Sequence, residues 1–373
     1  MDKQWRIIPF FVPHQGCPHT CVFCNQKLIS GSNSVPTGVE VAKQIREYLI
    51  TIPTGCEVEV AFYGGSFTGL SIGLQEELLA PAYQAYQEGL IKGIRISTRP
   101  DLIDPKVIEH LQKWGVRTVE LGVQSLNREV LTASGRGHTP EDAIRSAVMI
   151  REAGLILGLQ MMIGLPKDSR EKSLATGLGL IKLRPDFVRI YPTIVIRDTL
   201  LHKLFREGNY CPLSLEEAVD WTRLLFVKFI SHEIPVIRMG LQASESLLKP
   251  GEITAGPFHP AFGELVESAV ALEQLEMLLG KWKMQRETLD FQLTKSKVTM
   301  PEKLILTINP RYWSRIVGHY RANLKRIERK WKLSLKILGD EFLPVRDIRM
   351  QTDLEEVENY LSWQEFLTNC RMS

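Results

Sequence analysis

The stretch CPHTCVFC, residues 17–24, decides the fold, because it places three cysteines within one short loop. Soft thiolates grouped in this way select zinc, copper(I) or an iron–sulfur cluster. Structural zinc normally takes four protein ligands, and only His14 and His19 lie close enough in sequence to be considered as the fourth. An iron–sulfur cluster held by three cysteines instead keeps one iron open for a substrate or cofactor. The spacing favours this cluster, and its expected ligands are Cys17, Cys21 and Cys24.

Outward from this loop, short β-branched or aromatic runs alternate with helical patterns up to about residue 235. The expected strands are Arg6–Val12, Val58–Phe62, Ile94–Thr98, Thr118–Gly122, Leu155–Met161 and Phe187–Tyr191. The expected helices between them are Val39–Ile50, Gln75–Glu88, Pro105–Trp114, Pro140–Ala153 and Glu171–Leu183. This alternation predicts parallel strands joined by right-handed crossovers. Six such units are fewer than the eight of a closed barrel, so the predicted fold is α/β, a partial (β/α)6 barrel.

Polar and glycine-rich signatures follow the expected strands. The cysteine loop comes after the first strand, and YGGSF, TRPD, VQS, GLP and PT come after the second to the sixth. Parallel βα architectures bind their ligands at the carboxyl ends of the strands. We therefore expect one site lined by all six loops.

The cysteine loop resembles those of the radical S-adenosyl-L-methionine (SAM) superfamily. The resemblance implies that the open iron of a [4Fe-4S] cluster chelates the amino and carboxylate groups of SAM. One electron, from a donor such as flavodoxin or ferredoxin, then cleaves a carbon–sulfur bond to give a 5′-deoxyadenosyl radical. The aromatic residue before the third cysteine matches the position that packs near the adenine in this family.

Later motifs match further SAM contacts of the family. GGSF at residues 64–67 resembles the loop that meets the methionyl amino group, where glycine lets backbone carbonyls approach a ligand. Gln124 and Arg136 match SAM contacts of the oxygen-independent coproporphyrinogen oxidases, in which the guanidinium pairs with the cofactor carboxylate. A tight turn and an ordinary surface arginine are the alternatives. The implied cofactor-binding residues are Phe23, Gly64, Gly65, Ser66, Phe67, Glu120, Gln124, Arg136 and Gln160.

Over residues 7–235 the chain is most similar to the radical SAM domain of the Elongator catalytic subunit and its bacterial relatives. The motifs that carry this resemblance are FYGGSFTGL, STRPD, ELGVQS, GRGHT, MMIGLP and IYPTIVIRDTLLHKLFREGNY. That subunit modifies the wobble uridine of tRNA with acetyl-CoA bound by an acetyltransferase-like domain. The remaining residues of this chain contain no recognisable glycine-rich pyrophosphate loop, so neither that domain nor acetyl-CoA use is expected. The candidate catalytic residues are Arg189, where the Elongator group often has Lys, Tyr191 and His259.

The formal net charge of +3 comes from the last fifth of the chain, mostly from Arg311 to Lys332. The segment Lys303–Ile337 reads strand, helix, loop, helix, strand, and resembles the core of a KH domain. In that domain a GxxG loop grips the nucleic-acid backbone, but here Arg321 replaces the second glycine. The ordinary alternative is an amphipathic helix pair with a solvated basic face. The expected nucleic-acid-binding residues are Arg315, Gly318, His319, Arg321, Lys325, Arg326, Arg329 and Lys330.

We therefore expect a partial barrel at residues 1–245, a Gly/Pro-rich loop, helix and linker at 246–300, and a basic KH-like module at 301–373. No apolar run reaches the ~20 residues of a membrane helix and no signal peptide is recognised, so the cytoplasm is the expected location. The leading hypothesis is modification of RNA, either tRNA or ribosomal RNA, with tRNA favoured. Radical chemistry on a tetrapyrrole or another small molecule, and a heme-binding chaperone on a radical SAM fold, are the alternatives.

Overall fold

The structure is a computed structural model that describes residues 5–13, 15–31, 34–241, 244–293, 303–352 and 355–372. The chain divides into two units. The first unit is Met1–Trp221 with Ile234–Pro260, and the second is Thr222–Glu233 with Ala261–Ser373. Helix α9 (Leu215–Ser231) contributes to both units. The three-part division expected from composition stays a prediction.

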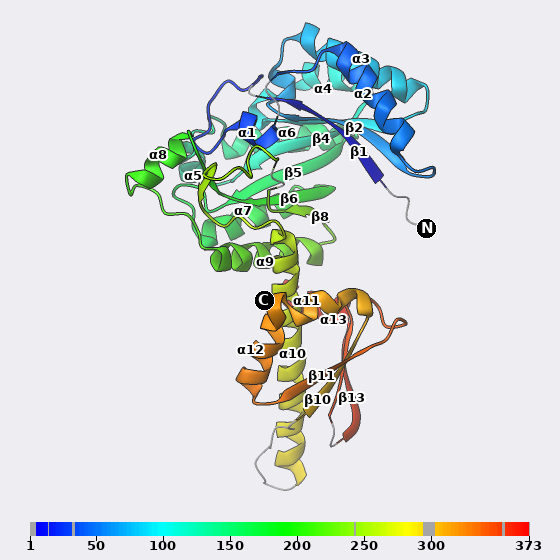
Figure 1. Cartoon of the computed structure of the whole chain (residues 1–373), viewed down its shortest axis with the longest axis vertical. Helices are drawn as coiled ribbons and strands as arrows, with labels where there is room; N and C mark the ends of the chain where they lie inside the picture. The colour runs from blue at the N-terminus through cyan, green and yellow to red at the C-terminus, as the bar shows by residue number, and fades with distance from the viewer. Residues whose placement is uncertain are drawn as a thin grey trace. The chain divides into compact units, whose positions relative to one another are not determined.

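A parallel sheet forms the centre of the first unit, in the order β1-β2-β3-β4-β5-β6-β8 (Figure 1). Its seven strands in the described part of the chain are β1 (Trp5–Val12), β2 (Glu57–Gly64), β3 (Gly93–Thr98), β4 (Val116–Gln124), β5 (Ile156–Ile163), β6 (Phe187–Pro192) and β8 (Val236–Met239). Every neighbouring pair runs parallel. All six expected strands are therefore present, and β8 extends the sheet at one edge.

The sheet curls so strongly that a side chain of β2 meets one of β6 across the inside of the curl. Arg189 on β6 donates from Nη2 to the hydroxyl of Tyr63 on β2 at 3.4 Å, and its guanidinium carbon lies 5.6 Å from the centre of the Tyr63 ring. Strands four positions apart in a flat sheet would be separated by about 19 Å. The contact therefore requires a partial barrel, and the predicted fold class is confirmed.

Helices connect consecutive strands and cover the outer face of the sheet (Figure 1). They are α2 (Gly38–Thr51), α3 (Ile72–Gln87), α4 (Pro105–Lys113), α6 (Pro140–Glu152) and α7 (Arg170–Lys182). An Asp, Ser or Thr side chain caps four of their N-termini, as preferred at this position: Thr37, Asp104, Thr139 and Ser169. Strand residues beneath the helices, such as Val60, Ile96 and Leu121, are completely buried.

Shorter helices and strands lie at the carboxyl end of the sheet. They are α1 (Gln26–Ser30), η1 (Phe67–Gly69), η2 (Pro100–Leu102), α5 (Arg128–Ala133), β7 (Val195–Ile196), α8 (Leu200–Arg206) and β9 (Ile253–Ala255). Strands β7 and β9 pair antiparallel as a small separate sheet. These elements, with the loops between them, surround the residues that the sequence marks as functional.

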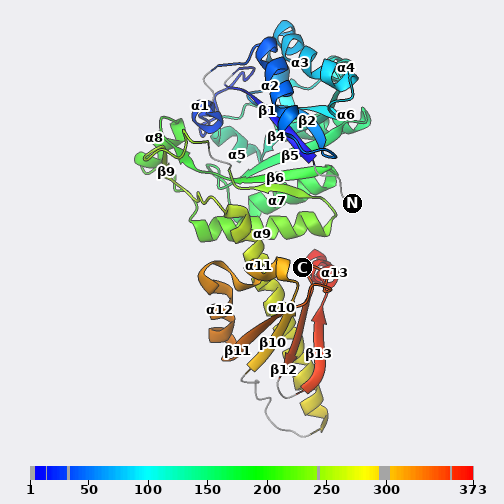
Figure 2. The same ribbon diagram turned by 45° about the vertical axis from the view of Figure 1, so that its right-hand side comes forward.

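The second unit contains helix α10 (Phe262–Leu293) and a four-stranded sheet of order β11-β10-β12-β13 (Figure 2). The other elements are β10 (Lys303–Ile308), η3 (Pro310–Tyr312), α11 (Trp313–Val317), η4 (His319–Arg321), α12 (Ala322–Trp331), β11 (Ser334–Gly339), β12 (Ile348–Thr352), β13 (Glu355–Leu361) and α13 (Trp363–Met372). Strands β10 and β11 are parallel, and α11 and α12 lie between them in the chain. The expected order of strand, helix, loop, helix and strand is confirmed.

Helix α10 is 32 residues long, and its buried apolar residues recur at helical spacing between Phe262 and Trp282. Val266, Val270 and Leu278 are buried, whereas charged residues occupy other positions of the helix. The linker expected at the end of residues 246–300 is helical up to Leu293, and residues 294–300 lie outside the described residues. Across the described ranges, no helix combines the length and apolarity needed to cross a bilayer.

The cysteine loop and the loop after β2 touch backbone to backbone. Gly65 N–H donates to Val12 O at 2.7 Å, and Ser66 N–H donates to Gln15 O at 3.2 Å. A Cβ atom at Gly65 would lie 2.1 Å from Gln15 O, and one at Gly16 would lie 2.0 Å from Ser66 O. Since both obstacles are backbone oxygens, only glycine permits this approach.

Replacing Gly65 with alanine should therefore destabilise the first unit. We expect Gly65→Ala to lower the free energy of unfolding by about 1–3 kcal/mol, the usual cost of forcing extra atoms into a packed region. Urea unfolding measures the change. The matched control is Gly73→Ala on α3, where an added Cβ meets no atom within 4 Å, and its stability should be unchanged or slightly higher. Equal stability of the two variants would contradict the packing described here.

Candidate functional site

The cysteine loop follows β1 and is held from two sides. Val22 N–H donates to Ser134 O at 3.1 Å, and Leu201 N–H donates to Val22 O at 2.7 Å. The Val22 side chain also belongs to a buried cluster with Val195, Leu201 and Tyr210. The loops after β4 and β6 therefore fix the position of the middle of the cysteine loop.

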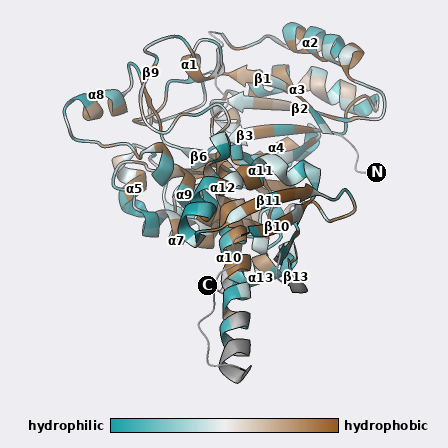
Figure 3. Ribbon diagram, turned by 60° about the horizontal axis from the view of Figure 1, so that its bottom comes forward, coloured by the Kyte–Doolittle hydropathy of each residue, from teal (hydrophilic) through white to brown (hydrophobic). Residues whose placement is uncertain are grey.

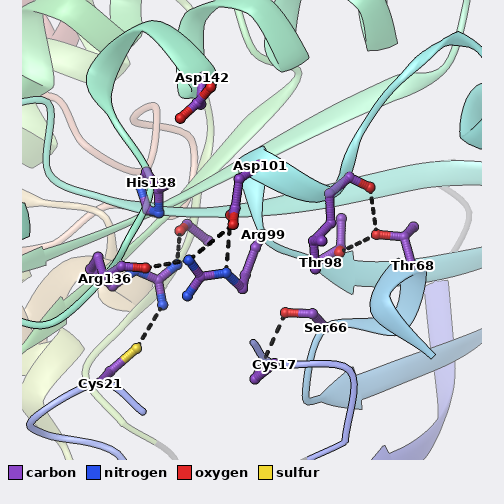
Figure 4. Close-up of polar contacts among 12 residues, drawn as sticks. Cys17, Cys21, Ser66, Thr68, Thr98, Arg99, Asp101, Arg136, His138 and Asp142 are labelled. Carbon is purple, nitrogen blue, oxygen red and sulfur yellow. Dashed lines mark hydrogen bonds and ion pairs between the residues drawn. The ribbon is translucent and has the colours of Figure 1, made fainter. Parts of the chain in front are cut away.

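The three predicted ligands lie near one another, since the Cys24 thiol interacts electrostatically with those of Cys21 and Cys17. Figure 4 shows Cys17 and Cys21 beside charged and polar groups. Cys17 Sγ lies 3.3 Å from Ser66 Oγ, and Arg136 Nη1 donates to Cys21 Sγ at 3.2 Å. Burial, together with the neighbouring Cys21 and Cys17 thiols, raises the pKa of the Cys24 thiol to about 12. Buried thiols in such proximity ionise together only when a strong cation compensates them, as iron does in a cluster. The donor set therefore fits an iron–sulfur cluster.

Among the described residues, no three His, Cys, Asp or Glu side chains converge on a single point as the ligands of one metal ion do. Cluster ligands need no such convergence, because each thiolate binds a different iron. Of the two histidines considered for zinc, His14 lies outside the described residues. The ring of His19 packs against Gly137, where an added Cβ would lie 2.2 Å from it.

Arg136 is almost completely buried, with 6% of its surface exposed, and is aimed at the cysteine loop (Figure 4). Besides its bond to Cys21, it donates from Nη2 to Gly122 O. Arg99 donates to the carbonyl of Arg136 and pairs with Asp101 through contacts of 3.0 and 3.2 Å. Arg136 Nε and Arg99 Nη1 are buried without a hydrogen-bond partner among the described residues. Unsatisfied cationic donors of this kind fit a carboxylate ligand such as that of SAM.

Gln124 ends β4 in a strained conformation. Its φ of 65° lies in the left-handed region, which a residue other than glycine rarely occupies. Gln160 on β5 donates from Nε2 to Gln124 Oε1 at 3.3 Å, so these two predicted SAM residues are in contact. Strain held by surrounding structure is characteristic of ligand sites.

Glu120 lies in a buried ion-pair network on the inner face of the barrel. Its Oε1 accepts from Arg95 Nη1 at 2.8 Å and from Arg189 Nη2 at 3.0 Å, and its Oε2 lies 2.8 Å from Arg189 Nε. Arg95 also pairs with Glu59 at 2.6 Å. Both oxygens of Glu120 are thus engaged by arginines, and its expected contact with the SAM ribose stays a prediction.

The two aromatic residues expected at the cofactor pack into apolar surroundings. Phe67 is 2% exposed, and its ring centre lies 5.2 Å from that of Phe62, so it anchors the loop after β2 in the core. Phe23 is half-buried against the cluster that contains Val22. The candidate catalytic residue His259 is half-buried in the first unit, in the segment of chain that follows β9. A direct role of any of them toward SAM or substrate stays a prediction.

The expected nucleic-acid-binding residues lie in the second unit, on α11, α12 and the η4 loop between them. Tyr320 and Arg321 have φ values of 49° and 62°, and Tyr320 is 83% exposed. The rings of His319 and Tyr320 lie edge to face with centres 4.1 Å apart. Asn323 holds the loop in place by donating to Arg315 O at 3.0 Å. Two consecutive left-handed residues therefore project this loop from the unit.

Some of the expected basic contacts are already neutralised within the second unit. Arg315 pairs with Glu267 at 3.0 Å, and Arg326 and Lys330 lie 3.7 and 3.2 Å from Glu276. Arg321, Lys325 and Arg329 are exposed, and they form no ion pair within the described ranges. Figure 3 shows hydrophilic residues along α12. These three cations are the ones most available to a polyanion.

Several side chains of the site were not singled out from the sequence. They are Glu59, Tyr63, Arg95, Arg99, Asp101 and His138. Arg99 and Asp101 belong to the TRPD signature, and His138 belongs to GRGHT, so the motifs carried a signal. Tyr63 likewise belongs to YGGSF. Glu59 and Arg95 carried no signal, because their importance depends on which strands the curled sheet brings together.

Comparison with known protein families agrees with this geometry. A family model described as the radical SAM superfamily matches residues 11–176, and one described as the radical SAM C-terminal domain matches residues 185–271. The chain belongs to the radical SAM superfamily. Its cofactors are accordingly a [4Fe-4S] cluster and SAM.

The radical SAM region is homologous to that of proteins named tRNA uridine(34) acetyltransferase and Elongator complex protein 3. It is 31% identical over 248 residues to the tRNA uridine(34) acetyltransferase of Methanocaldococcus infernus. This match covers 55% of this chain and 46% of that protein. It is 29% identical over 203 residues to Elongator complex protein 3 of Saccharomyces cerevisiae, covering 46% of this chain and 36% of that protein. The chain thus spans about half the length, or less, of the curated relatives it matches.

Among solved structures, the chain resembles the archaeal Methanocaldococcus infernus Elp3 with an N-terminal deletion. The TM-score is 0.56 at 23% identity, and the match covers 71% of this chain and 62% of that chain. At this identity the likeness concerns the fold, and it agrees with the partial barrel described above.

His138 makes the stability of this radical SAM protein depend on pH. Burial, then the charges of Arg136 and Arg99, lower the pKa of His138 from 6.5 to about 3. Between these values the unfolded chain binds a proton that the folded chain does not, so stability falls as the pH drops below about 6.5.

The cofactor-free protein should therefore lose about 1.4 kcal/mol more unfolding free energy than His138→Gln between pH 7.5 and pH 5.5. Glutamine keeps a donor for Val123 O, to which His138 Nε2 is bonded at 3.1 Å, but does not titrate. Urea unfolding at the two pH values measures the difference. Identical pH dependence in both proteins would show that folding leaves the pKa of His138 unchanged.

Proposed function

We propose that this radical SAM enzyme modifies RNA, and that tRNA is its substrate class. The observation that carries the proposal is the arrangement of Cys17, Cys21 and Cys24 beside Arg136, whose Nε is buried without a partner among the described residues. A second observation, the exposed basic loop and helix of the other unit, supports RNA as the substrate. The homology to proteins named tRNA uridine(34) acetyltransferase supports tRNA.

In this proposal the three cysteines hold the cluster and leave one iron open. When bound, the cluster and SAM supply a one-electron cleavage of a carbon–sulfur bond, which gives the 5′-deoxyadenosyl radical that abstracts hydrogen from the substrate. Ser66 Oγ, 3.3 Å from Cys17 Sγ, and Arg136 Nη1, 3.2 Å from Cys21 Sγ, stabilise the thiolates by hydrogen bonding. The electron donor, a flavodoxin or ferredoxin, stays a prediction.

The groups proposed to hold SAM surround the cysteine loop on the side of β2 and β4. Gly64 and Gly65 expose backbone beside the loop, and a φ of 105° at Gly64 is open to glycine but strained for other residues. Arg136 and Arg99 provide the unpartnered donors for the SAM carboxylate. Gln124, positioned by Gln160, offers an amide to the remainder of the cofactor.

The RNA contact is proposed for Arg321, Lys325 and Arg329. Lys325 and Arg329 are four residues apart on α12, so they lie on the same face of the helix. Arg321 precedes α12 in the left-handed loop that carries the exposed Tyr320. Cations on one surface attract a polyanion, and an exposed aromatic ring suits stacking on an unpaired base.

Tetrapyrrole chemistry and heme binding remain the alternatives to this function. No feature of the described residues favours either of them over RNA. Tetrapyrrole chemistry predicts SAM cleavage that is stimulated by a porphyrinogen and not by RNA. Heme binding predicts that the purified protein retains heme without turnover.

Replacing Cys21 should abolish both the cluster and the product. After anaerobic reconstitution with iron and sulfide, Cys21→Ala should lose the cluster absorbance and more than about 99% of reductive SAM cleavage, because the uncatalysed step is negligible. In cells that lack the gene, wild-type protein should restore a modified tRNA nucleoside detected by mass spectrometry, whereas Cys21→Ala should not.

The matched control is Cys211→Ala, which removes an exposed cysteine from the loop between α8 and α9. It should behave as wild type in both measurements. A cluster of unchanged iron content in Cys21→Ala would remove the cysteine assignment. A product found in ribosomal RNA and absent from tRNA would retain RNA modification but overturn the tRNA substrate.

Charge reversal of the exposed cations should weaken RNA binding. We expect the triple variant Arg321→Glu, Lys325→Glu, Arg329→Glu to bind tRNA at least about tenfold more weakly in gel shifts at 100 mM salt. Each lost phosphate contact should also reduce the slope of log affinity against log salt by about 0.7–0.9.

A matched triple reversal on the first unit provides the control, because it changes the net charge equally. Its positions are the exposed lysines Lys92, Lys113 and Lys182. The change in net charge alone should cause only a small loss of tRNA affinity. A control that binds tRNA as weakly as the α12 variant would therefore contradict the proposed RNA surface.

A further inference from the structure

The inner face of the partial barrel carries polar groups that the roles proposed for the cluster and SAM leave unused. Tyr63 on β2 and Tyr191 on β6 are half-buried on this face, with the Arg189 guanidinium between their hydroxyls. We infer that these three side chains bind a neutral nucleobase of the RNA substrate by donating hydrogen bonds to its carbonyl oxygens. The inference rests on the proposed function and names the chemical group that enters the barrel.

The geometry leaves the two phenols with their protons available. Arg189 Nη2 donates to Tyr63 Oη and Arg189 Nη1 donates to Tyr191 Oη, both at 3.4 Å. Each hydroxyl therefore accepts from the same guanidinium and keeps its own O–H to donate to a ligand. Burial, with the nearby Glu120 carboxylate, raises the pKa of Tyr63, so this phenol remains a donor at neutral pH.

The charges of the network cancel, and this decides between a neutral and an anionic ligand. Arg95 and Arg189 are held by Glu59 and Glu120 through contacts of 2.6 to 3.0 Å, and all four side chains are at most 13% exposed. Two guanidinium groups and two carboxylates carry no net charge. An anion would find the guanidinium groups of Arg95 and Arg189 already neutralised by carboxylates and would enter at a high desolvation cost. Neutral carbonyl oxygens gain the donors alone.

An aromatic wall adjoins the donors. The ring of Phe11 on β1 lies 6.2 Å from that of Tyr63, and Phe11 is also half-buried on the inner face. Aromatic side chains stack on the faces of unpaired bases, and every base presents such a face. Hydrogen-bond donors beside an aromatic wall are the combination that recognises a single extruded base.

The donors also lie next to the groups proposed for SAM. Gln160 on β5 is the direct pairing neighbour of Arg189 on β6, and its side chain reaches Gln124 on β4. All three residues face the inside of the barrel. A base held by Arg189 and the two tyrosines would therefore lie beside the cofactor that abstracts its hydrogen.

The test measures coupling, the ratio of modified nucleoside to 5′-deoxyadenosine, with tRNA purified from cells that lack the gene. The double variant Tyr63→Phe, Tyr191→Phe keeps both rings and removes only the hydroxyls. We expect its coupling ratio to fall at least about tenfold, because the base is no longer oriented toward the radical. Thermal unfolding of the variant verifies that it folds. The matched control is Tyr86→Phe on α3, outside this face, which should couple as wild type does.

A second arm tests the charge of the ligand with two competitors, uridine and orotidine, the latter carrying an added carboxylate. The inference expects uridine to inhibit RNA modification more strongly than orotidine, and the reverse order would overturn it. Unchanged coupling in the double variant, with wild-type protein modifying RNA, would overturn the inference and leave the proposed function intact. Wild-type protein that modifies no RNA would remove the proposed function and the inference together.

Discussion

The close approach of two backbone segments is the constraint on which the candidate site depends. The cysteine loop meets the loop after β2 at Gly16 and Gly65, where backbone oxygens lie about 2 Å from the position of any added Cβ. This approach places Ser66 beside Cys17 and brings the cysteine loop against the carboxyl end of the sheet. The loops after β4 and β6 then hold Val22 from the other side, so three separate crossovers position one set of thiols.

The curvature of the sheet decides what the barrel interior can bind. A flat parallel sheet would separate Tyr63 from Arg189. Each charged side chain on that face would then need contact with water or a separate ion-pair partner. Curling brings β2, β3, β4 and β6 around a common space, in which two arginines and two glutamates neutralise one another. Buried ionic groups are tolerated only when they are paired in this way. The consequence is a polar interior in which these four charges cancel, next to the cysteine loop.

Each unit has strained backbone at the place where a ligand is proposed to bind. Gln124 at the end of β4, and Tyr320 and Arg321 before α12, adopt left-handed conformations without being glycine. Such conformations persist only where the surrounding contacts enforce them, and they are concentrated at ligand sites. Gln124 is held by Gln160, and the η4 loop is held by Asn323, so each strained segment has an identified support.

The sequence alone determined the cysteine cluster, the alternation of strand and helix, and the loops that line the site, since these depend on spacing and on periodicity within short segments. It also located Arg136, Gln124 and the basic α12, because family motifs and charge density are visible in one dimension. Only the tertiary structure decided that Glu120 is occupied by Arg95 and Arg189, that Phe67 is a core residue, and that Glu276 neutralises Arg326 and Lys330. The physical reason is that ion pairs and burial depend on which distant segments meet. That is set by the curl of one sheet and the packing of one long helix, and no local pattern encodes either.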